Sequence, residues 1–320
     1  MKVAAAPAPL PRLAEHRPQR AASLGLPEDT LFLSKLPPIE GDFPPPPPDL
    51  KRPVLIVHGF NGAALDFFNM RNYLASNPRN KLGATFHPGK EDEFRASLRE
   101  KPDGRIHTIS FSKPYLSYRE LQAELTACLK VLNEETGGEV DVITHSMGGL
   151  ATRAHLDQGH DGIDKLIMIA PPNRGSLEAD LALAADRLNL YSHYIPEAKD
   201  ALRDLTLDEE FLGKQNNPYL NGLNQRWAEQ SAKVQATIIA GLGIPTPDWN
   251  WKLFSQGDGM VTASSTYMPG ARFAVTDVEH PAGIEREGDS GNRLFTFKYN
   301  HGSLVSDPTI QQFVGQILGS

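Results

Sequence analysis

The sequence predicts an α/β protein in which helices cover both faces of a mostly parallel sheet. After residue 50, short apolar or β-branched runs alternate with longer helical stretches, which is the pattern of repeated strand–helix–strand units. Most of these runs are unbroken, as in strands that are buried on both faces. The expected strands are Pro53–Val57, Arg105–Phe111, Val140–Thr144, Lys165–Ala170, Val234–Ala240 and Arg272–Thr276.

One crossover helix is clearly marked between the second and third of these strands. Leucines recur at helical spacing from Leu121 to Leu132, and Gly137-Gly138 supplies a stop signal. The only cysteine of the chain, Cys128, lies within this stretch, where we expect it to pack in the core, and it has no partner for an intramolecular disulfide. The next strand leads directly to Ser146.

The first 50 residues differ in composition from the rest of the chain. They are rich in Ala, Pro and Arg and end in five prolines, Pro44 to Pro48, which favour an extended backbone without hydrogen-bond donors. We expect residues 1–50 to form an extended N-terminal arm and residues 51–320 to form one α/β domain. No continuous apolar stretch follows Met1, so a cytoplasmic protein and a secreted one whose signal is absent from this chain both remain possible.

Residues from about 176 to 231 interrupt the alternation of strands and helices. Leucines and tyrosines are set among charges there, without a strand-like run, so we expect a helical insertion. Two interpretations stay open: ordinary helices packed on the core, or a lid whose apolar face meets lipid above an active site.

Bulk composition excludes some classes of function. The 320 residues are 40% hydrophobic and 22% charged, and no apolar stretch approaches the roughly 20 residues that span a bilayer. The net charge is −7, so the surface as a whole does not favour nucleic acid as a partner.

The residues around Ser146 carry the main chemical signal. The run Thr144-His145-Ser146-Met147-Gly148 places a serine between a buried strand and a helix. A serine at such a sharp turn has strained backbone angles, and glycine two residues later lets neighbouring segments pass closely. The helix N-terminus and the following N–H then face the position where negative charge develops.

This run resembles the nucleophile elbow of bacterial lipases with the α/β-hydrolase fold, although Thr144 stands where glycine is usual. Upstream, the run from Pro53 to Gly62 looks like the strand and His-Gly loop that follow one another in the same family. The resemblance implies that Phe60 and Met147 form the oxyanion hole through their backbone N–H groups. For His58 we prefer a role in bracing the loop over direct catalysis.

A candidate acid follows the Val234–Ala240 strand. Asp258, in the run Asp258-Gly259-Met260-Val261, resembles the segment that supplies the acid of the lipase triad. Its task is to accept a hydrogen bond from the histidine, fix the tautomer and stabilise the imidazolium. Asp248, between Pro247 and Trp249, matches no such pattern and is the weaker candidate.

Two histidines compete for the role of general base. His280 directly follows the last expected strand, where this fold usually carries its histidine. His301 precedes Leu304 and the helix start Asp307-Pro308, which resembles the segment around the catalytic histidine of lipases. We prefer His301 and keep His280 as the alternative; the order Ser146, Asp258, His301 is the one expected for this fold.

The resemblance implies a lipase or lipase-like esterase that forms an acyl-enzyme and needs no metal or organic cofactor. Similar runs extend over about residues 53 to 315 and include Ala170–Ser176 and Ala201–Thr206. The acidic loop from His87 to Glu93 contains metal-ligand residue types, but we expect it to be simply solvated. An acyltransferase or phospholipase with the same three residues, and a non-catalytic binding protein, are the alternatives.

Overall fold

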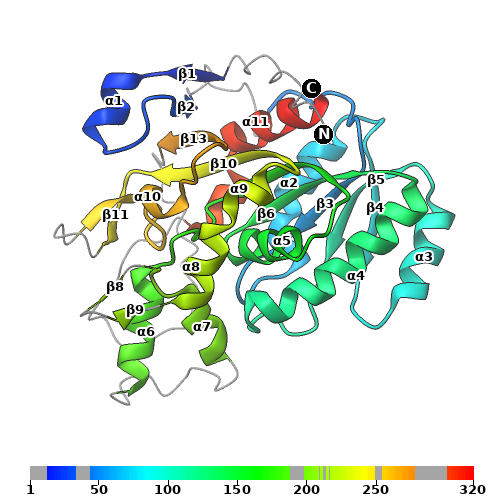
Figure 1. The fold of residues 1–320 in the computed structure, drawn as a ribbon. Helices are drawn as coiled ribbons and strands as arrows, with labels where there is room; N and C mark the ends of the chain where they lie inside the picture. Colours follow the sequence, from blue (N-terminus) through cyan, green and yellow to red (C-terminus); the bar gives the residue numbers. More distant parts are fainter. Residues whose placement is uncertain are drawn as a thin grey trace, which may run out of the picture.

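The computed structural model describes residues 13–33, 44–187, 198–208, 210–211, 214–215, 217–248, 254–277 and 301–320. A nine-stranded sheet runs through the molecule, with the spatial order β1-β2-β13-β10-β7-β6-β3-β5-β4 (Figure 1). Only the edge pair β1 and β2 is antiparallel; all other neighbours in the described sheet are parallel. The strands are β1 Ala14–His16, β2 Leu31–Leu33, β3 Val54–Val57, β4 Lys81–Phe86, β5 Gly104–Ile109, β6 Val140–His145, β7 Ile163–Ile169, β10 Gln235–Leu242 and β13 Arg272–Asp277.

All six strands expected from the sequence are present, as β3, β5, β6, β7, β10 and β13, and the predicted mostly parallel α/β fold is confirmed. The sequence did not indicate β4, whose first half is exposed and whose Gly83 interrupts the apolar run. A side chain at position 83 would collide with the ring of His107 on the neighbouring β5, at 2.3 Å from Cε1. Glycine is required there because the two strands approach closely around a buried histidine.

Part of the N-terminal segment belongs to the sheet. Residues 13–33 form β1, the helix α1 (Pro18–Ser23) and β2, and β2 pairs in parallel with β13. Arg20 of α1 donates to both carboxylate oxygens of Asp277 at the end of β13, at 2.7 and 2.6 Å. The structure therefore joins residues 13–33 to the main sheet, where the sequence predicted an extended arm.

The proline run lies against the C-terminal helix. A side chain at Gly315 would come within 3.0 Å of Pro47, and one at Gly319 within 2.4 Å of Pro48. Asn80 donates to the carbonyl oxygen of Pro48 at 2.9 Å and so holds a segment that has no N–H groups of its own.

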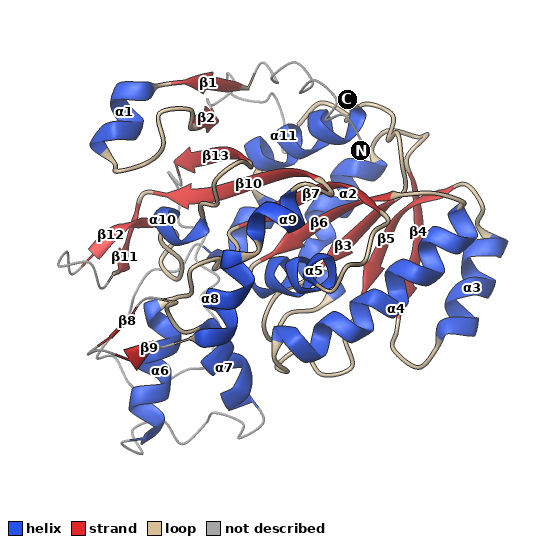
Figure 2. Ribbon diagram, in the orientation of Figure 1, coloured by secondary structure: helices blue, strands red, loops and turns tan. Residues whose placement is uncertain are grey.

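Helices cover both faces of the sheet, with α3, α4 and α5 on one face and α2 and α11 on the other (Figure 2). The longest, α4, begins with a reciprocal capping box between Ser117 and Glu120 and ends at Gly137, whose φ of 74° is the left-handed conformation of a helix stop. The helices of these layers are η1 Ala64–Phe67, α2 Phe68–Ala75, α3 Glu91–Glu100, α4 Tyr118–Thr136, α5 Met147–Asp157, α10 Ala263–Thr266, η3 His301–Ser306 and α11 Pro308–Gly319.

The core consists of two apolar layers, one on each face of the sheet. Along β3, Leu55 and Val57 join the layer beneath α4 and α5, whereas Val54 and Ile56 join the layer beneath α2 and α11. This division follows from the two-residue period of a strand. Cys128 is fully buried in the first layer, as predicted.

The segment between β7 and β10 is mostly helical where it is described, which agrees with the expected insertion. A two-stranded hairpin pairs Glu210 with Gln215 within it, a feature that the sequence did not indicate. The elements are α6 Leu177–Arg187, α7 Lys199–Leu205, β8 Glu210–Phe211, β9 Lys214–Gln215, α8 Pro218–Gln225 and α9 Trp227–Ser231.

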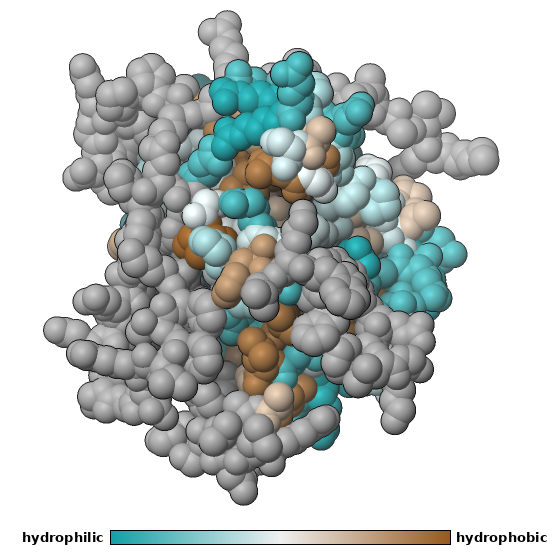
Figure 3. Space-filling model, turned by 90° about the vertical axis from the view of Figure 1, so that its left-hand side faces the viewer, coloured by the Kyte–Doolittle hydropathy of each residue, from teal (hydrophilic) through white to brown (hydrophobic). Residues whose placement is uncertain are grey.

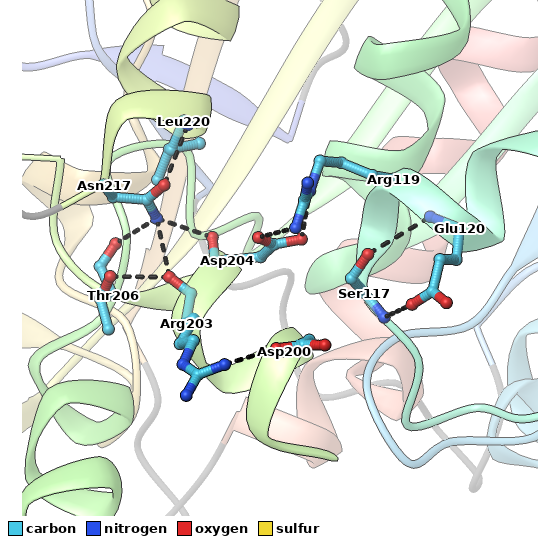
Figure 4. Close-up of polar contacts among 9 residues, drawn as sticks. All are labelled: Ser117, Arg119, Glu120, Asp200, Arg203, Asp204, Thr206, Asn217 and Leu220. Atoms are coloured by element: carbon cyan, nitrogen blue, oxygen red, sulfur yellow. Dashed lines mark hydrogen bonds and ion pairs between the residues drawn. The ribbon is translucent and has the colours of Figure 1, made fainter. Parts of the chain in front are cut away.

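A buried polar network fixes α7 to α4 and α8 (Figure 4). Arg119 of α4 donates through Nε and Nη2 to the two carboxylate oxygens of Asp204, both at 2.9 Å. Asn217 caps α8 by accepting from the N–H of Leu220, and its amide donates to the carbonyl oxygens of residues 203, 204 and 206. The end of α7 is thus attached to the α4 layer by side chains rather than by apolar packing alone.

Candidate active site

Ser146 lies at the turn between β6 and α5, with φ 53° and ψ −130°. Positive φ is unfavourable for a residue with a Cβ and persists only where the surrounding structure holds it. The Ser146 N–H donates to the carbonyl oxygen of Ile169 on β7 at 2.9 Å, and a side chain at Gly148 would lie 2.6 Å from the carbonyl oxygen of His58. The turn is therefore fixed from both neighbouring strands.

The loop after β3 passes directly beside Ser146. A side chain at Gly59 would lie 2.8 Å from the Ser146 Cβ and 3.4 Å from its Oγ. Asn61 has a φ of 51°, and its N–H donates to the carbonyl oxygen of Pro114 at 2.8 Å, which turns the loop back. Within the described part of the chain, the N–H groups of Phe60 and Met147, the predicted oxyanion donors, have no protein acceptor.

His58 braces this loop. Its Nε2 accepts from the N–H of Phe111 at 3.3 Å, so Nδ1 carries the proton and donates to the carbonyl oxygen of Gly59 at 3.0 Å. Burial lowers the pKa of His58, which keeps the ring neutral.

Asp258 and His301 form a buried pair, although 43 residues separate them in sequence. His301 Nδ1 donates to Asp258 Oδ2 at 2.7 Å. The other carboxylate oxygen, Oδ1, accepts from the N–H groups of Met260 and Val261 at 3.0 and 2.8 Å. Burial raises the pKa of Asp258, but the nearby His301 and these hydrogen bonds outweigh it, so the pKa lies below its usual value and the group is ionised.

Gly241, near the end of β10, provides the space for this pair. A side chain at position 241 would lie 3.0 Å from the Cβ of Asp258 and 3.1 Å from Leu304 of η3. Asp258 itself comes after a hairpin, β11 (Ile244–Pro247) with β12 (Phe254–Gly257), that returns the chain to β10. Because parallel strands end at one edge of a sheet, the segments after β3, β6 and β10 reach the same region.

The other two candidates from the sequence are placed differently. Asp248, the weaker acid candidate, accepts a hydrogen bond from the hydroxyl of Ser255 across the β11–β12 hairpin. His280, the alternative base, lies outside the described residues.

Sequence reasoning did not single out His145. Its Nε2 lies 3.0 Å from the carbonyl oxygen of His301, and the two rings are 4.6 Å apart between centroids. The two-residue period of β6 places His145 on the same face as Ile143, which packs in the layer that contains η3. That periodicity is the signal that points to this contact.

The insertion meets the candidate site at its first residues. Ser176, just before α6, donates through its hydroxyl to the carbonyl oxygen of Met260 at 2.6 Å, in the loop that carries Asp258. Figure 3 views the side of the molecule that carries β11 and the insertion and shows apolar surface near the middle of that face. Large apolar side chains exposed in these segments include Leu181, Phe254 and Met260.

Two further findings concern the described residues only. No group of three or more His, Cys, Asp or Glu side chains within them has the arrangement of a metal site. None of the described helices is both long enough and apolar enough to span a bilayer.

Compared by sequence, the chain matches no family profile and no curated protein. Among solved structures it is similar to the mature lipase BlEst2 of Bacillus licheniformis, with 20% identity and a TM-score of 0.47 over 75% of this chain and 88% of that chain. It is also similar to the phospholipase PlaB of Legionella pneumophila, with 20% identity and a TM-score of 0.47 over 68% of this chain and 46% of that chain.

The metagenomic carboxyl esterase MGS0156 gives a TM-score of 0.50 with 15% identity, over 89% of this chain and 80% of that chain. At such low identity the likeness concerns the fold alone. It agrees with the mostly parallel sheet covered by helices on both faces. The protein therefore has the α/β-hydrolase fold that the residues around Ser146 predicted.

Proposed function

We propose that the protein is a serine-dependent carboxylic ester hydrolase, a lipase or lipase-like esterase, with Ser146 as nucleophile, His301 as general base and Asp258 as acid. One observation carries the proposal: a strained serine at the end of β6 shares a sheet edge with a buried Asp–His pair whose hydrogen bond is 2.7 Å. Strain at a solvent-accessible serine is rarely kept without a function.

In the proposed reaction, His301 Nε2 takes the proton from the Ser146 hydroxyl as Oγ attacks the ester carbonyl. The Asp258 carboxylate, already accepting from Nδ1, stabilises the imidazolium that forms. The alcohol leaves with the proton from Nε2, and water then releases the acid from the acyl-enzyme. This chemistry uses side chains and backbone N–H groups of the protein and needs no cofactor.

The tetrahedral intermediate carries a negative oxygen that needs donors. The N–H groups of Phe60 and Met147 are the proposed pair, because Gly59 lies against Ser146 and both donors lack a protein acceptor within the described residues. Met147 is also the first residue of α5, where the helix dipole favours negative charge.

An ester with an apolar acyl group is the substrate class that the surroundings favour. Met260 directly follows the Asp258-Gly259 turn and is exposed, and Leu181 of the neighbouring α6 is exposed as well. Water-exposed apolar side chains beside a polar site are typical of surfaces that bind apolar ligands. With an apolar substrate of this kind, we also propose that the helical insertion acts as a lid over the site.

Labelling with a fluorophosphonate tests the nucleophile. We expect the wild type to form a covalent adduct and to hydrolyse p-nitrophenyl esters, with the activity depending on acyl-chain length. Ser146→Ala should lose the adduct and at least about 10³-fold of kcat, whereas Ser97→Ala on α3 should keep both.

Three outcomes would contradict parts of the proposal. Full activity of Ser146→Ala would remove the nucleophile assignment, and absence of any adduct on the folded wild type would favour a non-catalytic binding protein. Transfer of the acyl group to an alcohol, or release of fatty acid from phospholipid but not from neutral ester, would favour the acyltransferase or phospholipase.

A further inference from the structure

The side chain of His145 connects the strand that carries Ser146 to the segment that carries His301. Its Nε2 lies 3.0 Å from the carbonyl oxygen of His301. A carbonyl oxygen can only accept, so Nε2 of His145 carries the hydrogen and donates it. The two imidazole rings also touch, with centroids 4.6 Å apart and planes tilted by 44°, and the ring of Phe67 of η1 meets the His145 ring in a T-shaped arrangement.

His145 stays neutral in this position. Burial, together with the neighbouring His301, lowers its pKa to about 3. The titratable groups that influence it are His301, Asp258 and His58. The neighbouring strands present apolar residues here: Ile169 of β7 pairs with His145, and Val57 of β3 pairs with the preceding Thr144. A neutral ring beside His301 adds no repulsion when His301 becomes an imidazolium.

The contact with His145 adds to the interactions that fix His301 in place. Asp258 fixes the ring through Nδ1, and Leu304 with Val305 buries the rest of η3 in the apolar layer. The side-chain hydrogen bond alone leaves the ring free to tilt about the Nδ1–Oδ2 direction. The His145 ring, whose centroid is 4.6 Å from that of His301, limits this tilt, and its hydrogen bond to the carbonyl oxygen fixes the backbone from which the His301 ring extends.

We propose that His145 is a positioning residue for His301: its Nε2–H holds the carbonyl oxygen of His301 and thereby aims Nε2 of that ring at Ser146. The inference rests on the proposed function, because it gives His145 a task only if His301 is the base. It assigns no contact with substrate to His145.

Two substitutions separate the hydrogen bond from the packing of the ring. His145→Phe keeps an aromatic ring against Phe67 and His301 but removes the donor. His145→Gln loses the ring but presents an amide N–H near the former Nε2. We expect His145→Phe to lower kcat by about 10-fold to 100-fold with KM changed less than about threefold, because misplacement of a catalytic group slows chemistry more than binding.

We expect His145→Gln to keep kcat within about fivefold of the wild type. A matched control is His155→Phe on α5, which removes a buried histidine whose ring bonds Thr126 of α4 rather than His301. It should change the melting temperature rather than kcat. Equal activity of His145→Phe and wild type, or a larger loss in His145→Gln than in His145→Phe, would overturn the proposal.

A measurement on the wild type keeps the test independent of how the variants fold. Nitrogen NMR of the histidine rings should find His145 neutral, with its proton on Nε2, throughout pH 5 to 8. A His145 that titrates near pH 6, or carries its proton on Nδ1, would refute the inference. If Ser146→Ala is inactive while His145→Phe is fully active, this inference fails and the proposed function stands; an active Ser146→Ala removes the proposed function itself.

Discussion

Replacing Asp258 by Asn tests how the buried pair sets the tautomer of His301. The two backbone N–H groups of Met260 and Val261 point at Oδ1, at 3.0 and 2.8 Å, and they can be satisfied only by an oxygen. In Asp258→Asn the amide oxygen therefore stays at that position, and the amide NH₂ faces Nδ1 of His301. Nδ1 then has to accept, which moves the ring proton to Nε2, where it blocks uptake of the Ser146 proton.

The expected loss in kcat is about 10⁴-fold at neutral pH, the size seen when the orienting carboxylate of a serine–histidine–aspartate triad becomes an amide. This corresponds to about 5.5 kcal/mol of activation free energy, at 1.36 kcal/mol for each tenfold change. The assay is kcat for a p-nitrophenyl ester, together with the rate of fluorophosphonate labelling of Ser146. Both rates should fall together, because both need proton transfer to His301.

Asp248→Asn serves as the matched control for this substitution. Its carboxylate accepts from the Ser255 hydroxyl, and an amide oxygen can accept that bond equally well. We expect its activity to stay within about twofold of the wild type. A loss of less than tenfold in Asp258→Asn would refute the reasoning. A large loss in Asp248→Asn alone would show that Asp248, and not Asp258, is the acid.

Three further predictions concern stability, measured as the free energy of unfolding in urea. Arg119→Met should cost about 2 kcal/mol: it leaves the carboxylate of Asp204, which is 2% exposed, without its ion pair, although the guanidinium that is lost is itself 41% exposed. Arg203→Met breaks an exposed ion pair and should cost less than about 0.5 kcal/mol. Equal costs for the two variants would contradict this prediction. Thr144→Val should stabilise the protein by about 1 kcal/mol, since the buried Thr144 hydroxyl has no hydrogen-bond partner in the described structure, and a destabilised variant would argue against it. Burial raises the pKa of Asp141 to about 6, so the folded chain binds the proton of this carboxyl more tightly than the unfolded chain. The free energy of unfolding gained in this way is fully present below pH 3.8 and is lost as the pH rises through about 6. Asp141→Asn should remove that loss from the profile of stability against pH.

Local patterns were sufficient to predict the elements that lead to the candidate site. The strand before Ser146 and the helix from Tyr118 with its stop at Gly137 both depend on neighbours within a few residues. Unbroken apolar runs then indicated strands covered on both faces, and six of them lie in the parallel part of the sheet. Such features are encoded locally because dihedral preferences and hydrophobic period act over one or two turns.

The strands that the sequence did not indicate share a physical reason. β4 is half exposed and contains Gly83, and β2 is three residues long. Their stability comes from pairing with β5 and β13, and not from their own composition. Likewise, no local pattern indicated that Arg119 and Asp204, 85 residues apart, would form a partly buried ion pair.

The sequence by itself determined that a serine would occupy a strained turn between a buried strand and a helix, because glycine spacing and apolar runs specify that turn locally. The resemblance also named Asp258 and His301, but only the tertiary structure shows that these two side chains meet. Asp258 meets His301 because Gly241 leaves room beside β10, and His145 reaches the backbone of His301 because β6 and η3 share one face of the sheet. These contacts depend on how segments that are distant in the sequence meet at one edge of a parallel sheet. The number of residues between two segments does not determine how far apart they lie in the folded protein.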